Sequence, residues 1–180
     1  MSKILVKDKY FVPYIENAKI VRAVEAVAAR INEDYASSEQ PPMILSVLTG
    51  SIMYTAELMK HLTIPCEINC INISTYEGTS STGKVKNLLG PIRPLKGKRI
   101  IIVEDIVDTG NTIIALDRIA REMGAIDVKV TCLFIKPDVY KGSVKIDYPA
   151  MEIGKEFIVG FGLDYNQFGR NYPDIYILDE

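Results

Sequence analysis

The segment from residue 100 to 112, Ile-Ile-Ile-Val-Glu-Asp-Ile-Val-Asp-Thr-Gly-Asn-Thr, constrains the fold more than any other part of the sequence. Its first four residues are apolar and β-branched, which is typical of a strand that is buried on both faces. Three carboxylates and a turn of small polar residues follow, and from Ile113 to Met123 apolar side chains recur at helical spacing. A buried strand that turns into an amphipathic helix is the building unit of α/β proteins with a parallel sheet. The carboxylates would then lie at the carboxyl end of a strand, the edge where such sheets bind ligands.

The rest of the chain repeats this alternation of strands and helices. Apolar side chains recur at helical spacing from about residue 15 to 34, and further elements are predicted at 43–48 (strand), 52–61 (helix), and 67–73, 128–135, 156–161 and 175–178 (strands). Right-handed crossovers between parallel strands would place helices on both faces of the sheet. Because a chain of 180 residues that is 48% hydrophobic fits one compact core, we expect a single α/β domain over residues 1–180.

Charge and hydropathy disfavour several kinds of partner. The formal net charge is −2, so no overall positive field is available to attract nucleic acid, and we expect no nucleic-acid partner. No run approaches the roughly 18 to 20 apolar residues that span a bilayer, and the first residues carry no apolar signal-peptide core. We therefore expect a cytoplasmic protein with no membrane partner.

Cysteine and histidine chemistry is also disfavoured. Cys66, Cys70 and Cys132 lie in apolar, strand-like sequence without CxxC spacing, which predicts buried thiols rather than disulfides or a metal site. His61 is the only histidine, and it ends an apolar helical stretch. A Ser-His-Asp or Cys-His nucleophile, or a histidine-rich zinc site, would depend on this one residue, so we set those classes aside.

The turn at residues 108–112 has the features of an anion-binding site. Its backbone N–H groups, its two threonine hydroxyls and the positive end of the following helix could together hold a phosphate monoester. The turn lacks the Gly-Lys-Ser/Thr ending of a Walker A loop and the GxGxxG pattern of a dinucleotide site. The simpler alternative is that Asp108 or Thr112 only caps the helix.

Glu104 and Asp105 are adjacent carboxylates at the predicted end of a buried strand. They would repel each other there unless they shared a divalent cation or the hydroxyl groups of a diol. A ribose phosphate supplies two vicinal hydroxyls with a phosphate close to them. We therefore expect the carboxylates to hold a sugar and the turn at 108–112 to hold its 5′-phosphate. The alternative is a solvated acidic turn.

Residues 103–112, Val-Glu-Asp-Ile-Val-Asp-Thr-Gly-Asn-Thr, resemble the signature of the type I phosphoribosyltransferases, which bind 5-phosphoribosyl-1-pyrophosphate (PRPP). Four further segments are similar to motifs of the branch of this family that acts on hypoxanthine and guanine. They are the pyrophosphate loop at 48–51, the flexible catalytic loop at about 74–86, a purine-reading lysine at 136 and a base-binding hood at 157–170. The motifs occur in the family's order along nearly the whole chain.

The resemblance implies the type I phosphoribosyltransferase fold, a mainly parallel central sheet flanked by helices, with a small hood formed by N-terminal residues and about 150–180. It also implies a purine-salvage enzyme, a pentosyl (glycosyl) transferase. Such an enzyme transfers the 5-phosphoribosyl group from PRPP to N9 of hypoxanthine or guanine, giving IMP or GMP and pyrophosphate. The displacement at C1 has an oxocarbenium-like transition state and needs no covalent nucleophile. Mg²⁺ is implied as the cofactor, and a homodimer or homotetramer as the assembly.

The resemblance also assigns roles to individual residues. Catalysis is assigned to Asp108, as a general acid or base near purine N7, and to the loop residues Thr75 and Tyr76. The residues that bind the ribose and 5′-phosphate of PRPP are Glu104, Asp105, Asp108, Thr109, Gly110, Asn111 and Thr112. Pyrophosphate is assigned to Leu48, Thr49, Gly50 and Arg170, and the purine to Lys136, Phe157, Ile158 and Asp164. The implied metal ligands are Glu104, Asp105 and Asp164.

Two positions depart from the family pattern. Thr75 stands where a serine is expected at the tip of the catalytic loop, and because the hydroxyl is kept we expect function to survive. Thr49 stands where some relatives have a lysine, which leaves the setting of pyrophosphate affinity and subunit contacts open. The resemblance further implies a cis peptide bond between Leu48 and Thr49.

The sequence leaves rival functions open. A xanthine-preferring or pyrimidine phosphoribosyltransferase is the nearest rival, although Lys136 and the hood motif disfavour pyrimidines. A non-catalytic regulator that senses PRPP or binds RNA is disfavoured by the intact Asp108 and Arg170. A phospho-acceptor receiver domain would have no use for the Thr-Gly-Asn-Thr turn. The preference among hypoxanthine, guanine and xanthine is not fixed, because backbone carbonyls read the purine C2 position.

Overall fold

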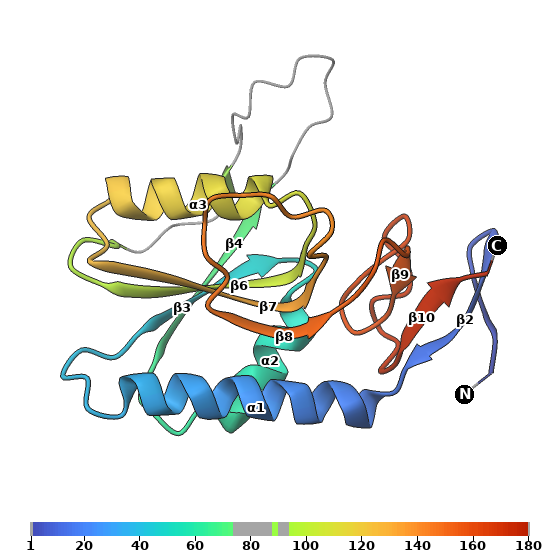
Figure 1. Ribbon diagram of the computed structural model, residues 1–180, viewed down its shortest axis with the longest axis horizontal. Helices are drawn as coiled ribbons and strands as arrows, with labels where there is room; N and C mark the ends of the chain where they lie inside the picture. The colour runs from blue at the N-terminus through green and yellow to red at the C-terminus, as the bar shows by residue number, and fades with distance from the viewer. Residues whose placement is uncertain (1, 74–87, 90–93, 180) are drawn as a thin grey trace, which may run out of the picture.

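The structure, a computed structural model, describes residues 2–73, 88–89 and 94–179. It contains two β-sheets of different size. The central sheet has six strands in the order β5-β4-β3-β6-β7-β8, and Figure 1 shows helices on both of its faces. Its strands are β3 (Met43–Leu48), β4 (Glu67–Ile73), β5 (Leu88–Leu89), β6 (Arg99–Val107), β7 (Asp127–Ile135) and β8 (Tyr148–Glu152). Neighbouring strands pair in parallel, except for β4 and β5, which are antiparallel. The predicted α/β architecture is confirmed.

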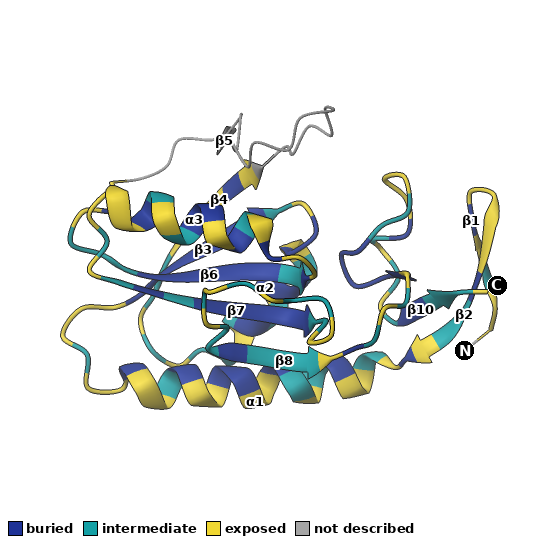
Figure 2. Cartoon of the chain, turned by 45° about the horizontal axis from the view of Figure 1, so that its top comes forward, coloured by how far each residue is buried: buried dark blue, intermediate teal, exposed yellow. Residues whose placement is uncertain are grey.

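β6 is apolar in its first half because both of its faces are covered. Ile100 and Ile102 pack in one core with residues of α3 (Asn111–Glu122), while Ile101 and Val103 pack in the other core with α1 (Asn17–Tyr35) and α2 (Ile52–His61). Figure 2 shows β6 buried along most of its length. The buried face of α1 follows the helical repeat that the sequence predicted, with Ile20, Val24, Val27, Ala28, Ile31 and Tyr35.

The parallel register brings the ends of three strands together at one edge of the central sheet. Ser46 of β3 pairs with Val103 of β6, which pairs in turn with Thr131 of β7. The segments that leave these strands are therefore neighbours, namely the turn at 49–51, the turn at 108–110 and the chain from Lys136. This carboxyl edge gathers the polar residues that the sequence placed there.

A second, antiparallel sheet lies beyond the carboxyl ends of β6, β7 and β8 (Figure 1). Its four strands run in the order β1 (Ile4–Val6), β2 (Lys9–Ile15), β10 (Ile175–Leu178) and β9 (Ile158–Val159). Val6, Phe11, Val159 and Tyr176 form a small apolar cluster of its own. This sheet and the loop at 160–170, together called the hood below, join residues near the start of the chain to residues near its end.

Sequence periodicity missed β1, β2, β5 and β8, and it made β9 too long. β2 and β8 each contain a proline, Pro13 and Pro149, which weakens a strand prediction. The predicted strand at 156–161 is reduced to two residues, and the chain turns at Gly160, which has a φ of 107°. β6 continues through Glu104 and Asp105 to Val107, so these carboxylates lie within the strand rather than after its end.

The cysteines differ in exposure. Cys132 is buried, Cys66 is half-buried and Cys70 is exposed, so the prediction of three buried thiols is wrong for Cys70. Ile68 and Asn72, at alternate positions of β4, are exposed as well, which identifies the uncovered face of this strand. Across residues 2–73, 88–89 and 94–179, no helix is both long and apolar enough to cross a membrane.

Candidate functional site

The turn between β6 and α3 forms a cradle of backbone N–H groups. α3 begins at Asn111 after Gly110, whose φ of 80° lies in the left-handed region, and no side chain caps the helix. The first N–H groups of a helix have no partner inside it, so here they are free to bind an anion at the positive end of the helix dipole. The alternative that Asp108 or Thr112 caps α3 is therefore wrong.

A pocket of about 100 Å³ opens over this cradle. It is lined by Glu104 and by the consecutive residues 106–113. A water molecule occupies about 30 Å³ in the liquid, so the pocket has room for a phosphoryl group. Glu104 and residues 108–112, six of the seven residues predicted to bind a ribose phosphate, thus share one pocket, while Asp105 does not line it.

Glu104 and Asp105 have different surroundings. Glu104 is 9% exposed, and its carboxylate oxygen Oε2 is buried with no hydrogen-bond partner among the described residues. Burial raises the pKa of Glu104 well above its usual value, and the charge of Asp105 raises it further. Burial also raises the pKa of Asp105 to about 6, although the Ile106 N–H, which donates to it at 2.7 Å, and the charge of Arg170 oppose this. Both carboxylates therefore need a cation or hydroxyl donors from a ligand to be stable when ionised.

A metal ion would find only part of its ligand set in the protein. In the described ranges, no group of three His, Cys, Asp or Glu side chains converges on one point. The unpartnered oxygen of Glu104 and the buried carboxylate of Asp105 still fit Mg²⁺, which often takes one or two protein carboxylates and completes its shell with water and substrate phosphates. The donor set therefore fits a metal that binds together with a phosphorylated substrate.

Arg170 and Asp164 form an ion pair near Asp105. Arg170 Nη2 lies 2.7 Å from Asp164 Oδ1, and Arg170 Nη1 donates to the Gly162 carbonyl at 2.7 Å. Both charges act on Asp105, because Arg170 lowers its pKa and Asp164 raises it. The hood loop from 162 to 170 thus brings a guanidinium and a further carboxylate close to the buried carboxylate of β6.

The segment after β3 is packed between β6 and the hood loop. The peptide bond between Leu48 and Thr49 is cis, as the resemblance implied. A Cβ atom on Gly50 would lie 1.6 Å from Asp105 Oδ2, so a side chain there would displace the Asp105 carboxylate. A Cβ atom on Gly162 would lie 2.1 Å from the Gly50 carbonyl oxygen, so only glycine fits at position 162. The N–H groups of Thr49 and Gly50 donate to no acceptor among the described residues. They are therefore available to an anionic ligand.

Lys136 and Asp108 meet where the turn at 108–110 approaches the hood. The Lys136 side chain is 11% exposed and its ammonium lies 3.8 Å from the carboxylate of Asp108, which is 52% exposed. Lys136 also donates to the Glu156 carbonyl at 3.1 Å. Because an ammonium has three N–H donors, Lys136 keeps at least one for a ligand acceptor beside Asp108.

Phe157 offers an exposed aromatic ring next to this pair. It is 47% exposed, and its ring lies edge-on to Tyr165 with the centroids 5.9 Å apart, and 6.3 Å from the ring of Phe11. A ring supported by two aromatic neighbours can stack on a flat ligand with its free face. The side chain of Ile158 is buried in β9, so it contributes to the core of the hood rather than to a ligand surface.

One contact of the site, made by Tyr140, could not be predicted from the sequence, and two predicted site residues lie in a part of the chain that the structure does not describe. Thr75 and Tyr76 lie outside the described residues. Tyr140 packs its ring against Gly110, where a Cβ atom would lie 2.2 Å from Tyr140 Cε2. Its hydroxyl donates to the Val144 carbonyl at 2.5 Å. The Thr-Gly-Asn turn predicted a special backbone conformation at Gly110, but no local pattern predicted the ring that covers it.

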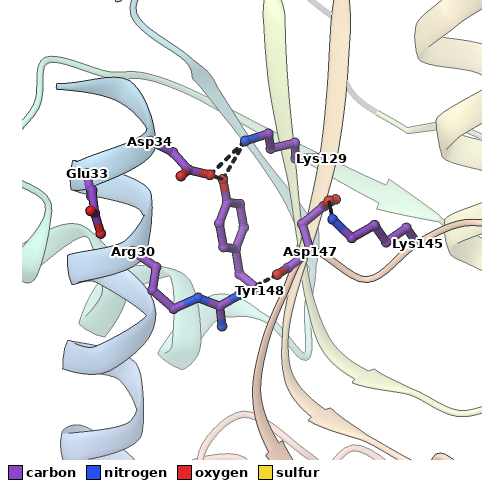
Figure 3. Close-up of a pocket in the computed structure, with 7 residues that line it drawn as sticks. All are labelled: Arg30, Glu33, Asp34, Lys129, Lys145, Asp147 and Tyr148. Carbon is purple, nitrogen blue, oxygen red and sulfur yellow. Dashed lines mark hydrogen bonds and ion pairs between the residues drawn. The ribbon is translucent and has the colours of Figure 1, made fainter. Parts of the chain in front are cut away.

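A larger pocket, of about 280 Å³, lies at the opposite edge of the sheet, between α1, β7 and β8 (Figure 3). It is lined by Arg30, Glu33, Asp34, Lys129, Lys145, Asp147 and Tyr148. Lys129 and the Tyr148 hydroxyl both donate to Asp34 Oδ2, at 2.8 and 2.5 Å. Lys145 pairs with Asp147 at 3.0 Å. Since its charges largely pair with one another, we assign this pocket to the packing of α1 on the sheet rather than to catalysis.

Comparison with known proteins places this arrangement in context. Residues 14–166 match the family described as phosphoribosyl transferase domain. A hypoxanthine-guanine phosphoribosyltransferase of Streptococcus pyogenes is 40% identical over 177 residues, which are 98% of this chain and 97% of the relative. Among solved structures, a hypoxanthine-guanine phosphoribosyltransferase of Bacillus anthracis with HEPES in its active site has a TM-score of 0.86 at 31% identity, covering 93% of this chain and 98% of its own. A hypoxanthine phosphoribosyl transferase of Trypanosoma cruzi, studied for the role of its C-terminal region in oligomeric state and activity, has a TM-score of 0.87 at 30% identity, covering 93% and 91%.

Proposed function

Since this chain belongs to the phosphoribosyl transferase family, in the branch of the hypoxanthine-guanine phosphoribosyltransferases, we propose that its carboxyl edge and hood form the active site for purine salvage. The enzyme transfers the 5-phosphoribosyl group from PRPP to N9 of hypoxanthine or guanine, giving IMP or GMP and pyrophosphate. The family match confirms the prediction of a pentosyl transferase with the type I fold. The observation that carries the proposed site is the pocket in which Glu104 lies over the free N–H groups of the turn at 108–112.

The 5′-phosphate of PRPP binds in this pocket. The N–H groups at the start of α3 donate to the phosphate oxygens, and the hydroxyls of Thr109 and Thr112 add further donors. The ribose hydroxyls then reach Asp105 and Glu104, whose buried Oε2 receives no hydrogen bond from the part of the chain that the structure describes. Their hydrogen bonds favour the ionised form of each carboxylate and so offset the cost of burying it.

The pyrophosphate group binds on the other side of Asp105. The N–H groups of Thr49 and Gly50 and the guanidinium of Arg170 supply donors for its oxygens. Mg²⁺, when bound, supplies positive charge that stabilises the departing pyrophosphate. We assign its protein ligands to Glu104 and Asp105. Asp164, the third ligand that the resemblance implies, acts on Asp105 through its charge but is paired with Arg170 and does not converge with the other two carboxylates.

The purine binds between Phe157 and Lys136. Phe157 stacks on the base, while the backbone of Ile158 and the region of Asp164 face its pyrimidine edge. Lys136 donates to O6 of hypoxanthine or guanine. With adenine the same donor would face an amino group, and a buried donor without an acceptor costs about 1 to 3 kcal/mol or more. This chemistry selects 6-oxopurines.

Asp108 serves as the general acid or base at N7 of the purine. Its carboxylate is half-exposed, lies 3.8 Å from the Lys136 ammonium and is not used to cap α3. It can therefore take the proton that the imidazole ring loses as N9 forms the bond to C1. Proton transfer by a positioned side chain is worth roughly 10²- to 10⁴-fold in rate. Thr75 and Tyr76, which would exclude water above this centre, stay a prediction from the sequence.

The assembly and location of the enzyme are also proposals. We propose a homodimer or homotetramer that works in the cytoplasm, where PRPP and free purine bases are its partners. The Trypanosoma cruzi relative was studied for the role of its C-terminal region in oligomeric state, which makes the oligomeric state of this chain a property to measure. Size-exclusion chromatography with light scattering distinguishes the two assemblies, and a monomer that is fully active at assay concentration contradicts both.

An ultraviolet assay of nucleotide formation tests the proposed function. PRPP and Mg²⁺ are supplied with hypoxanthine, guanine, xanthine or adenine in turn. We expect turnover with hypoxanthine and guanine, and a kcat/KM for adenine that is lower by about 10- to 100-fold or more. Chelation of Mg²⁺ with EDTA should abolish turnover. A Lys145→Ala variant serves as a matched control, since this lysine lies in the distant pocket of Figure 3 and its loss should leave activity within about twofold. Failure to form a nucleotide with any base would refute the proposal.

A further inference from the structure

Three hydroxyl groups are buried directly behind the pyrophosphate-binding segment. Ser46 lies in β3, Ser51 follows Gly50, and Thr55 lies one turn into α2, and all three residues are buried. Ser46 Oγ is 2.9 Å from Ser51 Oγ and 2.8 Å from Thr55 Oγ1. Ser51 Oγ donates to the Val47 carbonyl at 2.6 Å. The three side chains thus form one continuous chain of short contacts.

The direction of the hydrogen bonds in this chain follows from counting protons. A carbonyl can only accept a hydrogen bond, so the Ser51 hydroxyl must donate its single proton to the Val47 carbonyl. The contact between Ser46 and Ser51 then needs the proton of Ser46, and the contact between Thr55 and Ser46 needs the proton of Thr55. The order Thr55 to Ser46 to Ser51 to Val47 is therefore the assignment in which every close contact is a hydrogen bond.

This chain ties together the two ends of the segment at 48–50. Ser51 is the N-cap residue of α2, but its side chain does not cap the helix. The Ser51 hydroxyl and the Ser51 N–H, at 2.6 and 3.4 Å, both donate to the carbonyl of Val47, the residue before the cis peptide. The start of α2 is thereby held against the end of β3, and the short loop between them has fixed end points.

The front of the same loop is in close contact with two neighbours. Gly50 packs against the carboxylate of Asp105, and Gly162 packs against the Gly50 carbonyl. The hydroxyl chain supplies the support from behind. The N–H groups of Thr49 and Gly50, which have no acceptor within residues 2–73, 88–89 and 94–179, lie between these two supports, so their direction depends on both.

We propose that Ser46, Ser51 and Thr55 are positioning residues for pyrophosphate. Their hydrogen-bonded chain holds the N–H groups of Thr49 and Gly50 in the direction that binds the pyrophosphate group of PRPP and the free product. The inference rests on the proposed function of this loop, and it adds residues that touch no substrate. Because Thr55 starts the chain, its hydroxyl acts on the loop from within α2, through Ser46 and Ser51.

Replacement of Thr55 separates this role from simple packing. Thr55→Val keeps the shape of the side chain but removes the proton that Ser46 accepts, whereas Thr55→Ser keeps the proton and loses a methyl group. Thr131→Val is the matched control, because Thr131 is also a buried threonine with a hydrogen-bonded hydroxyl, but it lies in the middle of β7. Its hydroxyl is 2.5 Å from the Tyr54 hydroxyl and donates to the Tyr148 carbonyl at 2.8 Å. The measured quantities are the KM for PRPP, the KM for hypoxanthine, the Kd for magnesium pyrophosphate by calorimetry, and Tm.

We expect Thr55→Val to raise the KM for PRPP and the Kd for pyrophosphate about five- to tenfold, as expected for misdirected hydrogen-bond donors. The KM for hypoxanthine should stay within about twofold. Thr55→Ser should restore the PRPP and pyrophosphate values to within about twofold of the wild type. Thr131→Val should lower Tm without changing either value. Ser51→Ala, which cuts the chain next to the loop, should repeat the effect of Thr55→Val if the latter proves hard to purify.

Two results would overturn the inference. One is that Thr55→Val and Ser51→Ala lower Tm but leave the affinity for PRPP and pyrophosphate unchanged. The other is that Thr55→Ser weakens both ligands as much as Thr55→Val, since methyl packing would then explain the effect. If the wild-type protein itself forms no nucleotide and binds no pyrophosphate, the proposed function has failed instead, and that outcome is seen before any variant is measured.

Discussion

Replacement of Asp105 by asparagine should stabilise the unliganded protein while impairing PRPP binding. The carboxylate of Asp105 is buried against Gly50, and burial raises its pKa from 3.8 to about 6. A carboxyl group whose pKa is raised by folding stabilises the protein when protonated, and that contribution is lost as the pH rises through about 6. Asparagine cannot ionise, and its amide oxygen can still accept the hydrogen bond from Ile106. The variant therefore avoids the cost of a buried charge at neutral pH.

The magnitude follows from the two pKa values of Asp105. A move from 3.8 to about 6 corresponds to about 3 kcal/mol of free energy of unfolding at pH 7.5. For a chain of this length, that difference is about 6 to 12 °C in Tm. The gain should shrink as the pH falls from 7 toward 4.5, because the wild-type carboxyl group is then protonated in the folded state and no longer places a charge in the interior.

Urea unfolding of the unliganded protein, followed by circular dichroism at fixed protein concentration, measures this effect between pH 4.5 and 8. Glu39→Gln is the matched control, because Glu39 is an exposed carboxylate and its loss should change stability by less than about 0.5 kcal/mol. The reasoning is refuted if Asp105→Asn has the stability of the wild type at pH 7.5, or if its gain is the same at pH 4.5. In a parallel titration with PRPP and Mg²⁺, the variant should gain less stability than the wild type.

Three further substitutions have distinct expected outcomes. Lys136→Ala should raise the KM for hypoxanthine tenfold or more and narrow the gap between hypoxanthine and adenine in kcat/KM, and an unchanged ratio would contradict the assignment of Lys136 to O6. Asp108→Asn should lower kcat by roughly 10²- to 10⁴-fold while the affinity for PRPP stays within a few-fold, so equal turnover would remove its acid or base role. Tyr148→Phe removes the hydroxyl that donates to Asp34 at 2.5 Å, and it should cost about 1 kcal/mol of unfolding free energy with kcat/KM within twofold. A large loss of activity in that variant would show that the pocket of Figure 3 is coupled to the active site.

The central sheet was predictable because its strands are buried on both faces. Residues 100–103 and 128–135 read as strands without any tertiary information, since helices cover both sides of them. The strands of the hood were harder to predict, because β2 contains Pro13 and β9 has only two residues before Gly160 turns the chain. β2 becomes a strand by pairing with β10, which lies far away in the sequence, and β9 pairs with β10 across the loop between them.

The site was predictable as a set of residues but not as a set of contacts. The motif at 103–112 pointed to a phosphate cradle, and the pocket over it is found there. The sequence did not show whether a side chain caps α3. In the structure Gly110 is the N-cap residue, and no side chain caps the helix. The support that Lys136 receives from the Glu156 carbonyl depends on how the hood folds back, which local patterns do not encode.

The strand order of the hood has a consequence for the synthesis of the protein. β9, next to Phe157, pairs with β10, and β10 in turn joins it to β2. Residues 175–178 are synthesised after every strand of the central sheet, so the central sheet and its phosphate cradle can form before the hood strand that supports Phe157 is complete. Released chains truncated near residue 170, which keep every strand of the central sheet but lack β10, should therefore have a folded core yet fail to bind a purine.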